Sequence, residues 1–250
     1  MKLIKIQKPA APQILVDNQA VWTQNLLDAI NTYGGYSKIP EVEKSSLLSH
    51  YRHKDIQDAL FASSHQKCAF CECEPGESGH IEVEHFEPKS LYPALAFDWD
   101  NFLPACRKCN EAKLDFDTHA NPIINPAVEN PEQLLTYDFL RIKPRAGSGE
   151  ESKAQLTIDV CNLNCERLYK ARSALMRSIT EYIDELRDKI EWISEADTEQ
   201  KRKIRITKLK NSLAVIDSLT SAENAFSGYA KWFMQQCPEY HEAKRIASSG

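Results

Sequence analysis

The sequence predicts a mainly α-helical protein in which a small cysteine-rich unit is inserted between two helical segments. Apolar residues recur every three or four positions on both sides of residues 66–118, a period typical of amphipathic helices. Inside that range the pattern changes to alternation, and most of the eight cysteines are concentrated there. These observations divide the chain into residues 1–65, residues 66–118 and residues 119–250.

The first part is expected to form helices over residues 18–65. Trp22, Leu26 and Ile30 fall on one helical face, and Asn18 is a candidate N-terminal cap. Two glycines interrupt the pattern near residue 34, and Pro40 marks where the next helix begins.

The middle part is expected to combine a strand with a short helix. The sequence HIEVE at residues 80–84 alternates polar and apolar residues, which predicts a strand with Ile81 and Val83 facing the core. Glycines and prolines near residues 75–79 predict a turn before it. Residues 106–116 have the pattern of a short helix.

The last part begins with a proline-rich segment and continues with long helices. Residues 121–160 are expected to be rich in loops. After Glu166 a long amphipathic helix is predicted, followed by a second over residues 198–219. Thr220 and Glu223 form a capping-box pattern before a third helix. The apolar face of the first long helix is Leu168, Leu175, Ile179, Ile183, Leu186 and Ile190.

Composition and charge restrict the classes of function. The 42% hydrophobic and 27% charged residues are ordinary for a soluble globular protein. The N-terminal residues lack the apolar run of a signal peptide, and no segment approaches the length of a membrane span, so we expect a cytoplasmic protein without membrane contact. A formal net charge of -5 argues against nucleic-acid binding through bulk electrostatics, although it permits a local cationic groove.

Two cysteine pairs predict a structural zinc site. Cys68-x-x-Cys71 and Cys106-x-x-Cys109 supply four thiolates, the ligand set that tetrahedral Zn²⁺ prefers. In a reducing compartment such cysteines bind metal rather than form disulfides. Four thiolates fill the coordination sphere, so this zinc holds the fold and does no chemistry. Cys73 is a competing ligand. Three further cysteines are expected to pack as small apolar side chains: Cys161, Cys165 and Cys237.

Four polar residues follow one another in a recognisable order around the second cysteine pair. Glu84 directly precedes His85, Asn101 lies in the segment between the cysteine pairs, and Asn110 directly follows Cys109. This order resembles the HNH, or ββα-metal, nuclease motif, with asparagine at the final position (an H-N-N variant). The resemblance implies that residues 66–118 form a zinc-stapled ββα-metal unit between the helical segments.

Longer stretches narrow the resemblance. KCAFCE, IEVEHFEPKSLYP, DWDNFLPACRKCNEAK, PIINP and LTIDVCNLNCERLYKAR resemble the PtuB group, the HNH subunits of Septu-type and retron-associated anti-phage systems. The resemblance runs over residues 60–172. It implies an ABC-type ATPase partner similar to PtuA and, in retron forms, an RNA–DNA hybrid. Glu87 departs from the group, where a basic residue is common, and so removes a phosphate contact.

The resemblance also assigns roles. His85, near the ordinary pKa of about 6.5, would take a proton from water. Glu84 and Asn110 would give oxygen ligands to a catalytic Mg²⁺ or Mn²⁺. Asn101 would hold the segment between the strands and orient His85.

Several cations near this set could contact substrate phosphates, and Lys113 is the favoured one. Each could equally be an ordinary surface cation with no such role. They are Lys89, Arg107, Lys108 and Lys113. A second cationic patch lies on the helix over residues 198–219. The simpler interpretation is a solvated helix face, and the alternative is contact with nucleic acid bound by a partner.

Three functions remain open on the sequence. The first is an HNH endonuclease that hydrolyses phosphodiester bonds of nucleic acid, DNA favoured, as the effector subunit of an anti-phage complex. A non-catalytic zinc-stapled adaptor would need the cysteines but not the Glu84, His85, Asn101 and Asn110 set. A stand-alone HNH restriction endonuclease would need a reader domain, and none is recognisable. The helices after Glu166 are the predicted docking surface for the ATPase.

Overall fold

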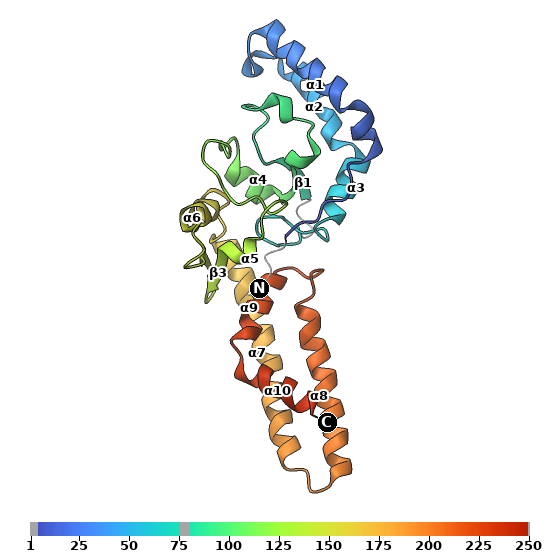
Figure 1. The fold of residues 1–250 in the computed structure, drawn as a ribbon, viewed down its shortest axis with the longest axis vertical. Coiled ribbons are helices and arrows are strands. Elements are labelled where there is room, and N and C mark those ends of the chain that lie inside the picture. The colour runs from blue at the N-terminus through green and yellow to red at the C-terminus, as the bar shows by residue number, and fades with distance from the viewer. Residues whose placement is uncertain (1–4, 76–80, 250) are drawn as a thin grey trace.

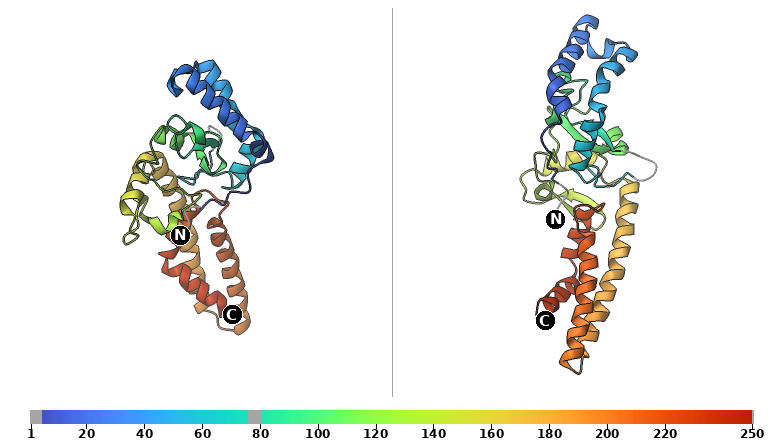
Figure 2. Two further views of the ribbon diagram at one scale, coloured as in Figure 1. Left: turned by 45° about the horizontal axis from the view of Figure 1, so that its top comes forward. Right: turned by 90° about the vertical axis from the view of Figure 1, so that its right-hand side faces the viewer.

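The chain forms an elongated molecule, seen here in a computed structural model that describes residues 5–75 and 81–249 (Figure 1). The N-terminal helices lie at one end, a small two-stranded sheet lies in the middle, and a long helical hairpin extends from the other end. The two further views in Figure 2 show the same arrangement.

The first part of the chain forms three α-helices: α1 (Gln13–Tyr33), α2 (Glu41–Leu48) and α3 (Lys54–Ala62). The expected cap at Asn18 is wrong, because α1 begins directly after Pro12 and the Asn18 side chain donates to the carbonyl of Ile14 at 2.8 Å. Gly34 ends α1 in the left-handed conformation, with φ of 72°, which glycine adopts without strain. Pro40 directly precedes α2, as predicted. The 3-10 turn η2 (Ser49–Arg52) joins α2 to α3.

The middle part contains an antiparallel strand pair followed by a helix: β1 (Ile81–His85), β2 (Phe102–Cys106) and α4 (Arg107–Lys113). Ile81 and Val83 are both buried, which confirms the predicted strand and its inward face. His80 and most of the predicted turn lie outside the described residues. β2 is buried over its whole length, so the strand pair lies inside the molecule.

The expectation of loops over residues 121–160 is wrong in its second half. The structure has a short helix, a β-hairpin and a further helix there: α5 (Pro131–Leu134), β3 (Leu135–Asp138), β4 (Arg141–Pro144) and α6 (Glu151–Val160). Each strand is only four residues long, too short for alternation to be visible in the sequence. The hairpin buries Leu135, Tyr137 and Ile142, and α6 packs beside β4.

Long helices form the C-terminal part: α7 (Glu166–Ser194), α8 (Glu199–Leu219), α9 (Ser227–Gln235) and α10 (Pro238–Ser248). The first two match the prediction, and the Thr198 hydroxyl caps α8 by accepting from the Lys201 amide at 3.2 Å. The capping box at Thr220 is wrong, since that hydroxyl donates to the carbonyl of Asp217 and the next helix starts at Ser227.

Three clusters of buried side chains hold these parts together. One joins the N-terminal helices to Val83 and Phe102 of the strand pair. The second surrounds the buried cysteines and reaches β3, β4 and α6. The third fills the space between α7, α8, α9 and α10. Within the described ranges, none of the helices combines the length and apolar character needed to cross a bilayer.

A buried arginine connects α7 to the β3–β4 hairpin. Arg172 is 1% exposed, and its guanidinium donates to the carbonyl of Leu140 at 2.5 Å and to the carbonyl of Leu163. It also lies over the ring of Tyr137, 5.9 Å from its centre. A buried cation is tolerated here because several acceptors surround it.

Replacing Arg172 with methionine is therefore expected to destabilise the protein. The substitution leaves the two carbonyls without donors in the interior, and we expect the free energy of unfolding to fall by about 2–4 kcal/mol. Arg177→Met, on an exposed turn of the same helix, should change it by less than about 0.5 kcal/mol. Denaturant titration followed by circular dichroism measures both, and equal effects would contradict the structural role.

Candidate functional site

Four buried thiols meet where the strand pair ends. The sulfur atoms of Cys68, Cys71, Cys106 and Cys109 all lie within 4.8 Å of one another. Cys106 ends β2 and Cys109 lies on α4, whereas the first pair comes from a turn held to β2 by a hydrogen bond from the Ala69 amide to the Pro104 carbonyl. The predicted grouping of the two pairs is confirmed, and these cysteines could hold a zinc ion.

A fifth sulfur and a cation lie beside this group. The sulfur of Cys73 is 3.2 Å from that of Cys71, which keeps Cys73 as a competing ligand. The guanidinium of Arg167, at the start of α7, contacts the sulfur of Cys106 at 3.9 Å. Hydrogen bonds from Cys109, Cys68 and Cys71 lower the pKa of Cys106, so a thiolate is favoured there. Four thiolates around a Zn²⁺ would carry net negative charge, which Arg167 would partly balance.

The turn that carries the first cysteine pair also holds a buried ion pair that sequence reasoning missed. Glu72 is 1% exposed and accepts from the Gly228 amide at 3.2 Å and the Ser227 hydroxyl at 3.4 Å, both at the start of α9. The Lys67 ammonium lies 4.0 Å from the same carboxylate. Burial raises the pKa of Glu72 to about 7, against the opposing effect of Lys67. These contacts join the cysteine turn to the C-terminal helices.

His85 ends β1 with its imidazole buried among aromatic rings. The ring meets Tyr51 and Phe102 edge to face, with centroid distances of 4.8 and 5.2 Å. Its Nε2 lies 2.9 Å from the Ala96 carbonyl, which can only accept, so Nε2 carries the proton and Nδ1 keeps its lone pair. Burial, together with the nearby Lys89 cation, lowers the pKa of His85 to about 3. The expected pKa near 6.5 is therefore wrong: the imidazole is neutral at pH 7 and a weak base.

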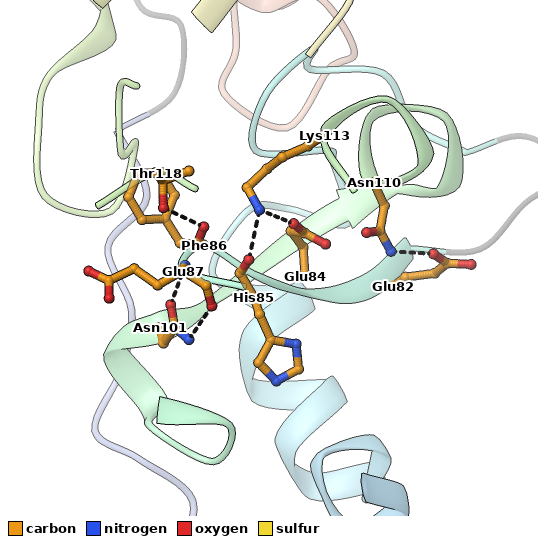
Figure 3. Close-up of polar contacts among 9 residues, drawn as sticks. All are labelled: Glu82, Glu84, His85, Phe86, Glu87, Asn101, Asn110, Lys113 and Thr118. Carbon is orange, nitrogen blue, oxygen red and sulfur yellow. Dashed lines mark hydrogen bonds and ion pairs between the residues drawn. The ribbon is translucent and has the colours of Figure 1, made fainter. Parts of the chain in front are cut away.

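Asn101 ties together the segment between the two strands, as Figure 3 shows. Its side-chain oxygen accepts from the Glu87 amide at 2.7 Å, and its amide donates to the carbonyls of Glu87 and Leu95 at 3.0 and 3.1 Å. Leu95 directly precedes Ala96, so Asn101 fixes the backbone whose carbonyl orients His85. Within the part of the chain that the structure describes, the Asn101 side chain bonds Glu87 and Leu95 and not the imidazole itself.

Glu84 forms an ion pair with Lys113 in the interior, which overturns the prediction that Lys113 lines the surface for phosphate. Glu84 and Lys113 are 5% and 2% exposed. The Lys113 ammonium lies 2.7 Å from Oε1 of Glu84 and donates to the His85 carbonyl at 2.9 Å (Figure 3). Burial raises the pKa of Glu84, and the Lys113 charge opposes that shift. The pairing explains why the lysine lies inside, because neither charge could be buried alone.

Asn110 and Glu82 form a second polar pair on the same face of β1. Asn110 donates its side-chain amide to Oε2 of Glu82 at 2.7 Å (Figure 3). Since a carboxylate only accepts, the amide nitrogen must face Glu82, and the oxygen of Asn110 points elsewhere. Alternation along the strand puts Glu82 and Glu84 on one face, a signal that could have identified Glu82 from the sequence. Glu84 and Asn110 thus lie along one strand face without a direct hydrogen bond between them.

The other predicted phosphate contacts differ in how far they are neutralised. Arg107 and Lys108 are exposed, but both pair with Glu111, at 2.7 and 2.8 Å. Lys89 is half-buried and lies over the ring of Tyr51, 5.7 Å from its centre. Glu87, the departure from the PtuB pattern, points its carboxylate toward His119 at 3.6 Å.

Two curated relatives carry one name. The chain is 32% identical over 188 residues to Septu protein PtuB of Bacillus thuringiensis, across 74% of this chain and 64% of that protein. It is 21% identical over 263 residues to Septu protein PtuB of Bacillus mycoides (strain KBAB4), across 89% of this chain and 85% of that protein. This is a PtuB-like protein. No protein-family model matches the chain.

The match covers only part of the first relative. This PtuB-like chain spans 64% of the length of the Bacillus thuringiensis relative. Neither relative's name states a reaction.

The cysteine group makes a direct prediction for the PtuB-like chain. We expect about one zinc per chain in purified protein, and Cys106→Ser should lower zinc content and thermal stability together, because one ligand is lost. Cys165→Ser, which changes a half-buried cysteine outside the group, should retain the zinc. Metal analysis by mass spectrometry and a thermal melt measure both quantities.

Cys73→Ser distinguishes the competing ligand. The variant should keep its zinc if the two C-x-x-C pairs bind it. Loss of zinc in Cys73→Ser but not in Cys71→Ser would show that Cys73 is the ligand. Soluble wild-type protein without zinc would contradict the predicted zinc site.

Proposed function

We propose that the chain is a metal-dependent HNH endonuclease that hydrolyses phosphodiester bonds, with DNA the favoured substrate. It would act as the effector subunit of an anti-phage defence complex with an ABC-type ATPase. The observation that carries this proposal is the β1–β2–α4 arrangement, in which β1 carries Glu84 and His85 and α4 carries Asn110 beside the same strand. Similarity to proteins named Septu protein PtuB supports the defence role.

His85 is the candidate general base, and its lowered pKa makes it a weaker one than an ordinary imidazole. Its Nε2 is fixed on the Ala96 carbonyl, so Nδ1 is the atom that would accept a proton from the attacking water. Asn101 would act as a positioning residue, because it holds the backbone next to Ala96. The aromatic contacts of the ring keep its orientation without consuming Nδ1.

Glu84 and Asn110 are the candidate ligands of a catalytic Mg²⁺ or Mn²⁺. Lys113 binds one oxygen of Glu84 and Glu82 binds the amide nitrogen of Asn110, which leaves Oε2 of Glu84 and Oδ1 of Asn110 for a metal. Two hard oxygens fit such a cation, with water completing its shell. When bound, the ion would polarise the phosphate and stabilise the leaving oxygen. Lys113 would have to share the carboxylate, which weakens the site.

A non-catalytic adaptor is the second candidate, and two observations favour it. Lys113 already neutralises Glu84, and the imidazole of His85 points away from the Glu84 carboxylate in Figure 3. Successive strand residues face opposite sides, so both groups can act on one phosphate only if it lies at the edge of β1.

The ATPase partner would dock on the C-terminal helices. α7 and α8 pack on each other and on α10 through their own core, far along the chain from the β1 site. The cations of α8 near its start are partly engaged: Lys201 pairs with Asp197, and Arg205 and Lys208 lie over the Trp192 ring. The RNA–DNA hybrid of retron forms stays a prediction from resemblance alone.

Substitution of His85 tests the reaction. With Mg²⁺ or Mn²⁺ supplied, His85→Ala should lower the cleavage rate by about 10²–10⁴, the usual effect of losing a general base. Zinc content should persist, although stability will fall because the Ala96 carbonyl loses its donor. His241→Ala, at an exposed position of α10, is the matched control and should cleave like wild type. A cleavage assay on DNA and RNA measures the rates; wild-type-like activity of a folded His85→Ala variant would contradict its role as base.

The partner model makes a separate prediction. Because the chain is acidic and Arg107, Lys108 and Lys113 are already paired with carboxylates, the isolated protein should bind nucleic acid weakly at physiological salt. Efficient cleavage should then require the ATPase subunit. Binding and cleavage across a salt series, with and without the ATPase, measure this. Tight binding and efficient cleavage by the chain alone would favour a stand-alone nuclease, whereas no cleavage even in the complex would favour the adaptor.

A further inference from the structure

A cleft of about 320 Å³ lies between β1 and the N-terminal helices. Tyr51, Arg52 and Gln57 line it from η2 and α3, and Glu82 and Asn110 line it from β1 and α4. The cleft therefore reaches from the candidate metal ligand Asn110 to the aromatic ring that packs on His85. Ile81 and Val83 of β1 complete its lining.

Two cations, Arg52 in the lining of this cleft and Lys89 over the Tyr51 ring, lack the carboxylate partner that neutralises other cations nearby. The Arg52 guanidinium lies 5.3 Å from the centre of the Tyr51 ring and donates to the Tyr51 hydroxyl at 3.1 Å. The Lys89 ammonium lies 5.7 Å from the centre of the same ring. Neither forms an ion pair with a carboxylate among the residues that the structure describes.

The surrounding cations behave differently. Lys54 pairs with Asp58 on the first turns of α3, Arg107 pairs with Glu111, and Lys113 is buried against Glu84. In an acidic chain, where carboxylates outnumber cations, Arg52 and Lys89 form a positive patch over the Tyr51 ring. The Glu82 carboxylate also lines the cleft, where it accepts from the Asn110 amide.

One aromatic ring links this patch to the candidate base. Tyr51 is 7% exposed and meets the His85 imidazole edge to face at 4.8 Å. Its buried ring fixes where Arg52 and Lys89 can lie relative to His85. The Tyr51 hydroxyl also orients the guanidinium fork, the group best suited to bind two phosphate oxygens at once.

We propose that Arg52 and Lys89 bind the phosphodiester backbone of the substrate strand and, through Tyr51, set its position relative to His85. The inference rests on the proposed function and deepens it: the N-terminal helices contribute a substrate-binding residue from outside the β1–β2–α4 unit. Contacts to phosphate carry no sequence information, so Arg52 and Lys89 would bind the phosphodiester backbone that DNA and RNA share.

The salt dependence of binding tests the phosphate contact. Full-length zinc-loaded chain is titrated, from low salt upward, onto labelled DNA duplex, single-stranded DNA and single-stranded RNA. Each lost phosphate contact should reduce the slope of log affinity against log salt by about 0.9 for duplex DNA or about 0.7 for single strands. Arg52→Ala and Lys89→Ala should each show this reduction with several-fold weaker binding at low salt.

Matched variants separate the specific contact from bulk charge. Lys54→Ala removes a cation two residues away that is already paired, and should leave the slope unchanged. Arg52→Lys keeps the charge and should restore the slope while losing part of the affinity. Zinc content and a thermal melt confirm that each variant is folded, which is expected because Arg52 is exposed.

Different results would contradict the phosphate contact and the proposed nuclease activity. The phosphate contact is overturned if Arg52→Ala keeps the wild-type slope and affinity, or if Lys54→Ala changes them equally. In either case the nuclease proposal still stands, provided that the wild-type chain cleaves nucleic acid. If the wild-type chain binds none of the three probes even at low salt, and cleaves none with its partner, the proposed function fails and the inference with it. Reduced slopes on DNA alone, or on RNA alone, support the contact and identify which backbone it takes.

Discussion

The meeting of four cysteines at the end of the β1–β2 ladder is the constraint on which the candidate site depends. A two-stranded ladder is marginally stable by itself in water. Here one end of it is held by Cys106 of β2 and Cys109 of α4, which lie against the turn carrying Cys68 and Cys71. The same turn is bound to α9 through Glu72, and Arg167 of α7 contacts Cys106. The cysteine group therefore connects the site to the long C-terminal helices as well as closing the small sheet.

Buried charge determines the polar face of β1. Transferring a lone carboxylate or ammonium into the interior costs several kcal/mol, so each buried charge has to find a partner of opposite sign or several hydrogen bonds. Glu84 and Lys113 satisfy one another, and Lys113 also bonds the backbone of His85. That pair fixes the distance between α4 and β1 and with it the position of Asn110, one helical turn before Lys113. A buried ion pair adds little net stability, since the desolvation of both charges offsets their attraction, and its effect here is to fix geometry, as the proposed metal site would require.

The sequence was informative where a local rule applied and uninformative where contact depended on packing. Paired C-x-x-C spacing predicted the four-cysteine group, alternation predicted β1, and apolar periodicity predicted α7 and α8. The β3–β4 hairpin was missed because four-residue strands carry too few inward positions to show alternation. Asn110 and Lys113 share a helix face, so their common orientation toward β1 was available from spacing. Spacing could not show that Lys113, rather than Arg107, pairs with a carboxylate in the interior, because that depends on how α4 lies across the strand. Nothing local could have linked Arg52 to His85, which are separated along the chain and joined only through Tyr51.

The two faces of the strand pair are supported by different parts of the chain, and this has a consequence for how the site works. Val83 and Phe102 pack into the N-terminal helical core, whereas Leu103, Ala105 and Cys106 pack into the core around the cysteines. His85 belongs to the first environment, through Tyr51 and Phe102, and Glu84 belongs to the second, through α4. The candidate base and the candidate metal ligand, although adjacent in sequence, are thus positioned by separate cores. Because adjacent residues of the same strands, such as Phe102 and Leu103, pack into different cores, both cores must stay intact for the imidazole and the carboxylate to keep their relative positions.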